Sequence, residues 1–325
     1  MKIPKNFEKY LDAFSRLRTD RNRNYWGEET CFGAPHKPFL LLSVMDLAAQ
    51  GQITRNLIVP GQEIVETFNG YWQLVIPPGR TTSMAYPFFY LQSDGFWHLA
   101  PLEDRRVPKT ASTPSMAWLR RTFAGARLDE DLFAFLLNPV YREQLRMVLV
   151  QKYFAKEVQP RVAEQGFTNF AAFVYARDLI AKAAETTTGF GKTEPPPPQV
   201  RDQGFRKAIV QLYDHRCALC GIRMLTDEGH TVVEAAHIVP WSQCHDDLPN
   251  NGLCLCRLCH WSFDEGLMSV GDDYQVLVSG RVRTDRNMPG HILTLTDRPI
   301  FKPDPEKFWP ARENLAQHRR EVFVR

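Results

Sequence analysis

The sequence predicts an α+β protein of two domains. We expect a mostly α-helical first domain with a small β-hairpin, followed by a smaller domain in the order strand, loop, helix. Three observations predict this: helical periodicity before residue 186, four consecutive prolines at 195–198, and paired cysteines around strand-like and helix-like segments beyond them. With 325 residues, the chain is long enough for two domains with separate cores.

The stretch TTTGFGKTEPPPPQV, residues 186–200, marks the boundary between the domains. Four prolines in a row cannot continue a helix and favour a stiff extended segment, whereas the Gly and Thr residues before them are flexible. We therefore predict domains at 1–185 and 201–325, joined by a proline-rich linker at 186–200.

Apolar spacing in the first domain predicts several helices. Pro35 is placed to begin a helix, and FLLLSVMDLAAQ, residues 39–50, is apolar on nearly all sides, so this helix should be central to the core. Residues 141–149 and 173–180 each place apolar side chains on one helical face. The segment YPFFYLQSDGFWHLAP, residues 86–101, predicts two short aromatic strands joined at its Ser-Asp-Gly turn.

The hydrophobic fraction of 44% and the charged fraction of 24% are typical of a soluble globular protein. No apolar run approaches a membrane span and the charged start is unlike a secretory signal, so we expect cytoplasmic residence and no membrane partner. The net charge of +3 leaves contacts with phosphate to local basic clusters. Two such clusters, which could equally be solvated surface, are Arg16, Arg18, Arg21 and Arg23, and Arg105, Arg106 and Lys109.

The second domain alternates strand-like and helix-like segments. DQGFRKAIVQLY, residues 202–213, predicts a helix, and the β-branched HTVVEAAHIVP, residues 230–240, predicts a strand. NNGLCLC, residues 250–256, is expected to be a loop, and CRLCHWSFDEG, residues 256–266, a helical turn or two. Further short strands are expected in YQVLVSGRV and HILTLTD.

Two cysteine pairs predict a structural zinc site. In a reducing compartment, CxxC spacing favours metal binding over disulfides, because a tight turn aims two sulfurs at one ion. A site closed by four thiolates has no open position, so this zinc would stabilise the fold without taking part in chemistry. The alternative is that these are ordinary buried thiols; Cys244, His245 and Cys254 are expected to be structural. The predicted ligands are Cys217, Cys220, Cys256 and Cys259.

Three polar residues around the cysteines follow a recognisable order. His237 ends a strand in AAHIVP, Asn251 opens NGLCLC, and His260 comes directly after the second cysteine pair in CRLCHWSFD. In these motifs, over residues 215–270, the chain resembles the HNH nucleases, whose catalytic unit is a ββα-metal fold. The alternative for each histidine taken alone is a satisfied interior residue.

The HNH resemblance implies a role for each residue. His237 would be the general base that takes a proton from the attacking water, and Asn251 would hold the imidazole or its loop in orientation. His260 would ligate a catalytic Mg²⁺ or Mn²⁺, with Asp264, one helical turn later, as a second ligand or a partner of the ligand. Many HNH nucleases carry a metal ligand directly before the base, where this chain has Ala236. Asp264, Glu234 or water would have to replace it.

The first domain has a resemblance of its own. APHKPFLLLSVMDLAAQGQI, PPGRTTSMAYPFFYL and SDGFWHLAP resemble the sulfur-binding domain of McrA-like, modification-dependent restriction endonucleases, over about residues 5–180. These proteins join that domain to an HNH nuclease and recognise phosphorothioate DNA, in which sulfur replaces a non-bridging phosphate oxygen.

An apolar pocket would gain dispersion contacts with the large, weakly hydrated sulfur atom and would leave a phosphate oxygen poorly solvated. Nearby cations must still balance the charge of the DNA backbone. The alternatives are an ordinary buried strand at YPFFYL and a locally packed helix start at His-Lys. The residues predicted to bind DNA and sulfur are His36, Lys37, Arg80, Tyr86, Pro87 and Tyr90.

Together these features predict a metal-dependent DNA endonuclease of a modification-dependent restriction system, with phosphorothioate-modified double-stranded DNA as its partner. Three alternatives stay open: an HNH endonuclease that reads methylated or hydroxymethylated bases, a non-catalytic zinc protein that binds DNA, and a zinc-stabilised protein-interaction module. Cleavage of both strands would need two successive nicks or a homodimer.

Overall fold

The computed structural model describes residues 4–102, 114–184, 195–284 and 290–324. The chain divides into two compact units, one of Met1–Phe170 with Asp227–Gly229 and one of Ala171–Thr226 with His230–Arg325. The division falls within the long helix α8 (Gln159–Ala184). Much of the predicted linker at 186–200, like the cluster of Arg105, Arg106 and Lys109, lies outside the described residues, so the predicted boundaries stay a prediction.

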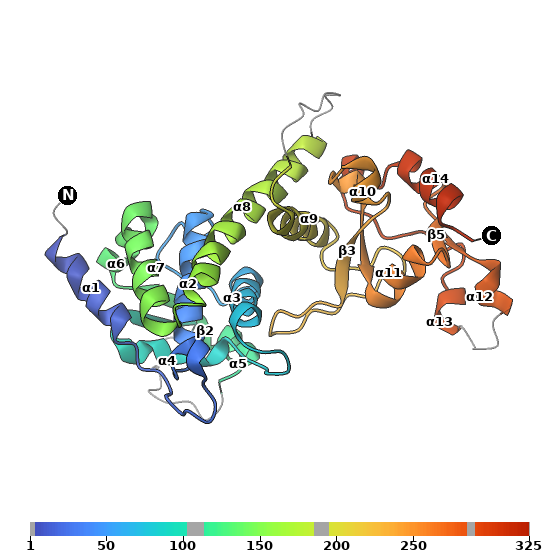
Figure 1. Ribbon diagram of the computed structural model, residues 1–325. Coiled ribbons are helices and arrows are strands. Elements are labelled where there is room, and N and C mark those ends of the chain that lie inside the picture. The colour runs from blue at the N-terminus through green and yellow to red at the C-terminus, as the bar shows by residue number, and fades with distance from the viewer. Residues whose placement is uncertain (1–3, 103–113, 185–194, 285–289, 325) are drawn as a thin grey trace. The chain divides into compact units, whose positions relative to one another are not determined.

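The first unit is mostly helical, and its elements run from blue to green in Figure 1. Its two strands pair antiparallel, with Trp97 opposite Leu128 and an irregularity between Ala100 and Pro101. Before α8, the elements are α1 (Lys5–Ser15), η1 (Glu28–Thr30), α2 (His36–Ala49), α3 (Gln62–Val75), α4 (Ala85–Tyr90), η2 (Leu91–Asp94), β1 (Trp97–Pro101), α5 (Met116–Thr122), β2 (Phe123–Leu128), α6 (Glu130–Leu137) and α7 (Pro139–Tyr153).

Helix α2 is the centre of this unit, as its apolar sequence predicts. Every residue from Lys37 to Ala48 is buried, and the helix packs against α3, α4, α6 and α7. Its one buried acid, Asp46, is fully paired: the Arg146 guanidinium lies 2.5 Å away, and Tyr71 and Asn169 donate hydrogen bonds at 2.8 and 2.7 Å. A buried charge costs free energy unless it is paired and hydrogen-bonded, and this one is both.

The predicted hairpin at 86–101 is wrong in position, although the fold-class prediction of a helical domain with a small β element is confirmed. Residues 85–90 form helix α4, and β1 pairs with β2 instead. Pro87 is compatible with this helix because it stands in the first turn, where backbone N–H groups have no partner within the helix. Phe88 and Phe89 are fully buried, so packing in the core decides the outcome.

The second unit is built on a two-stranded ribbon followed by a helix, as the ββα fold predicts. Strands β3 and β4 pair antiparallel, with Val233 opposite Cys256 and His237 opposite Gly252. Its elements, yellow to red in Figure 1, are α9 (Pro198–Leu212), β3 (Val233–His237), α10 (Trp241–Cys244), η3 (Pro249–Asn251), β4 (Gly252–Cys256), α11 (Arg257–Asp264), β5 (Met268–Val270), β6 (Val276–Val278), α12 (Gly280–Thr284), α13 (Gly290–Leu293), η4 (Glu306–Phe308) and α14 (Arg312–Glu321).

Five segments of this unit test the sequence predictions. The predicted helix at 202–213 and strand at 230–240 are confirmed by α9 and β3. The predicted loop at 250–256 is wrong from residue 252 onward, because residues 252–256 form strand β4. The predicted strand at 291–297 is also wrong: α13 and a turn take its place, and only β6 of the segment before it is extended.

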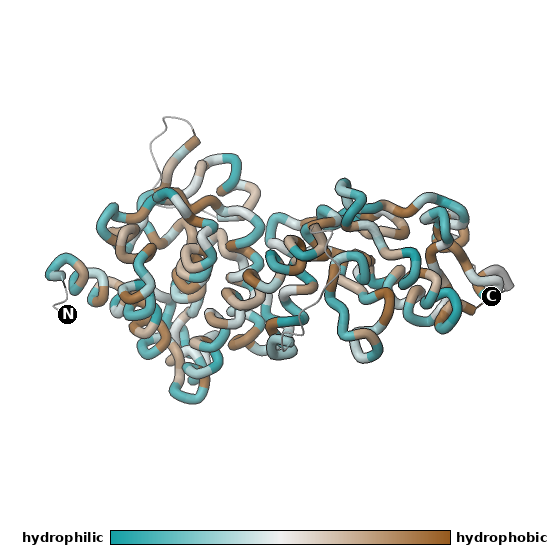
Figure 2. The backbone as a smooth tube through the Cα atoms, turned by 90° about the horizontal axis from the view of Figure 1, so that it is seen from above, coloured by the Kyte–Doolittle hydropathy of each residue, from teal (hydrophilic) through white to brown (hydrophobic). Residues whose placement is uncertain are grey.

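Hydrophobic and hydrophilic residues alternate over short distances along the backbone (Figure 2). Among the described helices, none is both long and apolar enough to cross a membrane.

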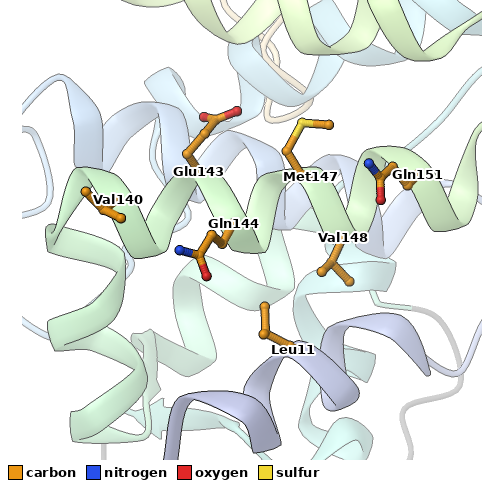
Figure 3. A pocket seen from close by; sticks show the side chains of 7 residues that line it. All are labelled: Leu11, Val140, Glu143, Gln144, Met147, Val148 and Gln151. Carbon is orange, nitrogen blue, oxygen red and sulfur yellow. The ribbon is translucent and has the colours of Figure 1, made fainter. Parts of the chain in front are cut away.

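An open groove lies between α1 and α7 of the first unit. Leu11 of α1 faces α7, where Val140, Met147 and Val148 supply apolar side chains (Figure 3). None of the residues predicted to bind DNA or metal lines this groove.

Candidate functional site

The four cysteines of the two CxxC pairs meet in the second unit. Cys217 and Cys220 lie in the turn after α9, Cys256 ends β4 and Cys259 stands in the first turn of α11. Their sulfur atoms all lie within 4.8 Å of one another, and the Sγ atoms of Cys220 and Cys256 are 3.7 Å apart. Zinc bound tetrahedrally at about 2.3 Å from each sulfur requires a separation of about 3.8 Å, so the arrangement fits a structural zinc ion.

The remaining cysteines of the second unit lie outside this cluster. Cys254 is fully buried, and burial raises the pKa of its thiol to about 12. A thiol that stays protonated is a poor metal ligand. Cys244 is exposed, and its thiol donates hydrogen bonds to the carbonyl oxygens of Val239 and Pro240 at 3.5 Å. The structural role expected for both cysteines stays a prediction.

His237 ends β3, and its ring is held on two sides. The imidazole stacks on Phe205 of α9, with 3.9 Å between ring centroids and 8° between planes. Its Nε2 atom lies 2.7 Å from Oδ1 of Asp247. Asp247 is only 5% exposed, and its other oxygen accepts a hydrogen bond from the Tyr175 hydroxyl at 2.8 Å. The ring orientation is therefore fixed by a buried carboxylate.

Asn251 is fully buried and orders the loop that follows β3. Its side-chain oxygen accepts a hydrogen bond from the Val239 N–H at 3.0 Å, and its amide donates to the carbonyl oxygens of Val239 and Asp246 at 3.0 and 2.9 Å. Of the two tasks that the HNH resemblance implies, holding the imidazole or holding its loop, the contacts of Asn251 match the second.

His260 has a carboxylate near each ring nitrogen. Nε2 lies 3.5 Å from Oδ2 of Asp264, and Nδ1 lies 3.5 Å from Oε2 of Glu234. One Mg²⁺ or Mn²⁺ ion with ligands at about 2.1 Å can touch both Nε2 and Asp264, because those atoms are closer than twice that distance. Glu234 contacts the opposite nitrogen, where a carboxylate orients a metal-binding imidazole. Glu234 is therefore better placed to orient the His260 ring than to replace the metal ligand that is missing at Ala236.

Among the described residues, no side chain forms a hydrogen bond or ion pair with the imidazoles of both His237 and His260. Successive side chains of a strand point to opposite faces, so Glu234 and His237, three residues apart on β3, point to opposite faces of the ribbon. No hydrogen bond or ion pair within the described ranges gives His237 and His260 a common partner. Within those ranges, the four cysteines are also the one group of three or more His, Cys, Asp or Glu residues whose ligand atoms all lie within 4.8 Å of one another.

The predicted cations of the first unit differ in their surroundings. Lys37 is buried, and its ammonium group pairs with Asp94 at 2.5 Å and donates to Ser93. His36 packs between the rings of Trp26 and Trp72, and burial lowers the pKa of its imidazole to about 4, so it is uncharged at pH 7.

Arg80 is exposed, with its guanidinium over the Trp26 ring and donating to the Tyr25 carbonyl. It is the one predicted cation of the three that combines a permanent charge with exposure.

The predicted sulfur-binding residues lie on α4. Tyr86 is 44% exposed, Pro87 is buried and Tyr90 is half-buried. Helix α4 packs against α2, and the Lys37 ammonium group reaches Ser93 and Asp94 just beyond α4. The segment with Tyr86 and the segment with His36 therefore share one core, although among the described residues no hydrogen bond or ring contact joins the side chains of Tyr86 and His36.

Comparison with known families decides what these units are. Residues 8–165 match the model described as "ScoMcrA-like, DNA sulfur-binding domain", and residues 217–271 match the model described as "HNH endonuclease". The chain joins a DNA sulfur-binding domain to an HNH endonuclease domain. The predicted combination of an McrA-like DNA sulfur-binding domain with an HNH nuclease domain is confirmed at the level of these two domains.

No curated protein matches the chain. One solved structure, titled "Modification dependent TagI restriction endonuclease", is similar at 25% sequence identity, with a TM-score of 0.29. The match covers 39% of this chain and 39% of that chain.

Sequence reasoning misses the residues that surround His237. Asp247, Tyr175 and Phe205 come from a loop and two helices that carry no metal-site or nuclease motif. Arg201 of α9 also approaches Asp247, with Nε 3.9 Å from Oδ2. The one signal available is the role predicted for His237, since an imidazole that takes up a proton is commonly oriented by a carboxylate.

Proposed function

We propose that the protein is a restriction endonuclease that binds phosphorothioate-modified double-stranded DNA through residues 8–165 and hydrolyses a phosphodiester nearby through its HNH domain. The observation that carries the proposal is the presence of both domain families in one chain. A nuclease domain of about 55 residues has little surface for reading DNA, so selectivity falls to the larger domain.

In the sulfur-binding domain, we place the modified phosphate beside Tyr86, Pro87 and Tyr90. The apolar surface of Tyr86 and Tyr90, supported from below by the buried Pro87, would favour sulfur over oxygen through dispersion and through the smaller cost of removing water from sulfur. Arg80 would balance the charge of the DNA backbone, with His36 as a neutral hydrogen-bonding partner. Lys37 would reach the phosphate only by leaving Asp94.

In the HNH domain, His237 would take the proton of the attacking water while Asn251 keeps the loop after β3 in place. His260 and Asp264 would hold Mg²⁺ or Mn²⁺, which supplies stabilisation of the negative charge that develops on the phosphate and the leaving oxygen. His237 and the His260–Asp264 pair must then meet at one phosphodiester. Catalytic distances in free enzymes are commonly long and shorten when substrate binds.

We expect the protein to bind a duplex with one sulfur substitution more tightly than the same duplex with oxygen, in a mobility-shift assay without divalent ions. Changing Tyr86 to serine should bring the two affinities together, because a polar hydroxyl interacts better with hydrated oxygen than with sulfur. A loss of about 1–2 kcal/mol of preference corresponds to roughly 5- to 30-fold in the affinity ratio.

Leu137→Ser is the matched control, because Leu137 of α6 has nearly the same exposed fraction as Tyr86, 43% against 44%. It should keep the preference for sulfur. If the wild-type protein binds the sulfur and oxygen duplexes equally but binds a duplex with methylated or hydroxymethylated bases more tightly, phosphorothioate is not the modification that it recognises. If Tyr86→Ser keeps the full ratio, the pocket lies elsewhere.

A further inference from the structure

Asp247 is a buried carboxylate with no role in the HNH motif, and it makes the shortest polar contact of the proposed base. Its Oδ1 lies 2.7 Å from Nε2 of His237, and its Oδ2 accepts the Tyr175 hydroxyl at 2.8 Å. Burial, followed by the bond to Asp247, raises the pKa of Tyr175 well above its ordinary value, so this hydroxyl stays a donor. Both oxygens of Asp247 are thus used as acceptors.

These contacts decide which ring nitrogen carries the proton. An ionised carboxylate can only accept hydrogen bonds, so the His237 nitrogen that faces it must be the N–H. In the neutral ring the other nitrogen, Nδ1, is then unprotonated and able to accept a proton. Among the described residues, none forms a hydrogen bond with Nδ1 of His237.

We propose that Asp247 is a positioning residue for hydrolysis: it fixes His237 in the Nε2–H form, turns Nδ1 toward the attacking water, and stabilises the imidazolium that forms. This inference rests on the proposed function of His237 as the base. In the step, water transfers a proton to Nδ1 as its oxygen bonds to phosphorus. The bond from phosphorus to the leaving oxygen breaks, that oxygen is protonated from solvent, and the imidazolium later returns its proton to solvent.

Other groups surround this pair and set its electrostatics. Arg201 of α9 approaches Oδ2 of Asp247, and its guanidinium stacks on Trp241 at 3.8 Å. Asp246 lies next in the chain, with its side chain accepting the Leu248 N–H at 2.8 Å. Of the two adjacent aspartates, therefore, one bonds the imidazole and the other caps a turn. Asp246→Asn is therefore a control that removes the same negative charge as Asp247→Asn without touching the contact with the imidazole.

The test is Asp247→Asn in the full-length, zinc-loaded protein, assayed for nicking of supercoiled plasmid and cleavage of a sulfur-substituted duplex with Mn²⁺. Asparagine keeps the size of the side chain but can donate to Nε2, which favours the wrong ring form. We expect the cleavage rate to fall by about 10²- to 10⁴-fold, the range seen when an oriented general base loses its partner. DNA affinity and zinc content should stay as in the wild type.

Rescue by a conservative variant separates positioning from mere structural support. Asp247→Glu keeps a carboxylate that can only accept from Nε2, so it should recover part of the single-turnover rate that Asp247→Asn loses. Asp246→Asn should change the rate by no more than a few-fold. If Asp247→Asn cleaves at the wild-type rate, while His237→Ala is inactive, the positioning role is overturned and the base is not.

The protonated nitrogen of His237 can also be identified without a cleavage assay. This measurement uses the wild-type protein, so it tests the proposal even if the Asp247→Asn variant folds poorly. In ¹⁵N-labelled wild-type protein, the imidazole nitrogen shifts, assigned with His237→Ala, should show the proton on Nε2 of His237. A proton on Nδ1 in the wild type would overturn the inference. If instead His237→Ala cleaves DNA at full rate, the proposed function fails, and the measured ring form still reports on the contact with Asp247.

Discussion

Replacing His237 with alanine should reduce DNA cleavage by at least about 10²- to 10⁴-fold, the usual contribution of a general base. The side chain is partly buried at the end of β3, and its loss removes the proposed proton acceptor without removing a zinc ligand. Binding of sulfur-substituted DNA should be unchanged, because the proposed sulfur pocket lies in the other domain. Single-turnover cleavage and a mobility shift on the same duplex measure the two effects.

His230→Ala serves as the control for this variant. His230 is an exposed histidine of the same unit, three residues before β3, and its backbone N–H bonds the Thr226 hydroxyl. It should cleave DNA like the wild type. Full-rate cleavage by His237→Ala would remove His237 as the base, whereas a joint loss of cleavage and of DNA binding would point to a damaged fold.

Replacing Cys256 with serine should unfold the HNH domain. Structural zinc sites contribute about 10–16 kcal/mol of binding free energy, which is as large as the whole stability of a typical domain, about 5–15 kcal/mol. Cys217, Cys256 and Cys259 are themselves part of the buried core of this unit, so losing the ion removes its central cross-link. Zinc content should fall, and limited proteolysis should degrade the chain beyond residue 186 while leaving the first domain intact.

Cys254→Ser is a close control, because Cys254 is fully buried on the same strand two residues earlier and is not one of the four clustered cysteines. A buried hydroxyl costs about 1–3 kcal/mol, so this variant should be less stable than the wild type yet keep its zinc. A folded, zinc-free Cys256→Ser protein would show that the ion is not the element that stabilises the domain.

The sequence predicted best where chemistry restricts both residue type and spacing. Cysteine pairs two residues apart meet in one cluster because each pair occupies a single turn, whatever the rest of the fold does. The order His237, Asn251, His260 likewise marks the end of a strand, the start of its partner and the following helix. Helix α2 was predictable for a similar reason, since an apolar surface on all sides can only be buried.

The predictions that failed concern aromatic and β-branched segments whose conformation is set by tertiary packing. Residues 85–90 have strand-like composition but form α4, because Phe88 and Phe89 reach the core from a helix and Pro87 fits its first turn. Residues 252–256 form a strand because β3 offers a partner, which the Asn-Gly start of the segment did not reveal.

Partners of single polar residues were also hidden from the sequence. Lys37 was a candidate to balance the charge of the DNA backbone, with a locally packed helix start as the alternative, and the fold pairs it with Asp94, 57 residues later in the chain. Asp247 stands in a stretch of polar residues without periodicity, and only the fold turns it, rather than Asp246, toward His237. Such pairings depend on how loops pass one another, which local patterns do not encode.

The most direct test of the whole account is the single-turnover cleavage rate of two duplexes that differ in one non-bridging atom, sulfur or oxygen, with Mn²⁺ and wild-type protein. The proposed function predicts faster cleavage of the sulfur-containing duplex at protein concentrations that saturate only that duplex. Tyr86→Ser should lose this preference for the sulfur-containing duplex. Equal rates on both duplexes under those conditions, or no cleavage of either by zinc-loaded protein, would contradict it.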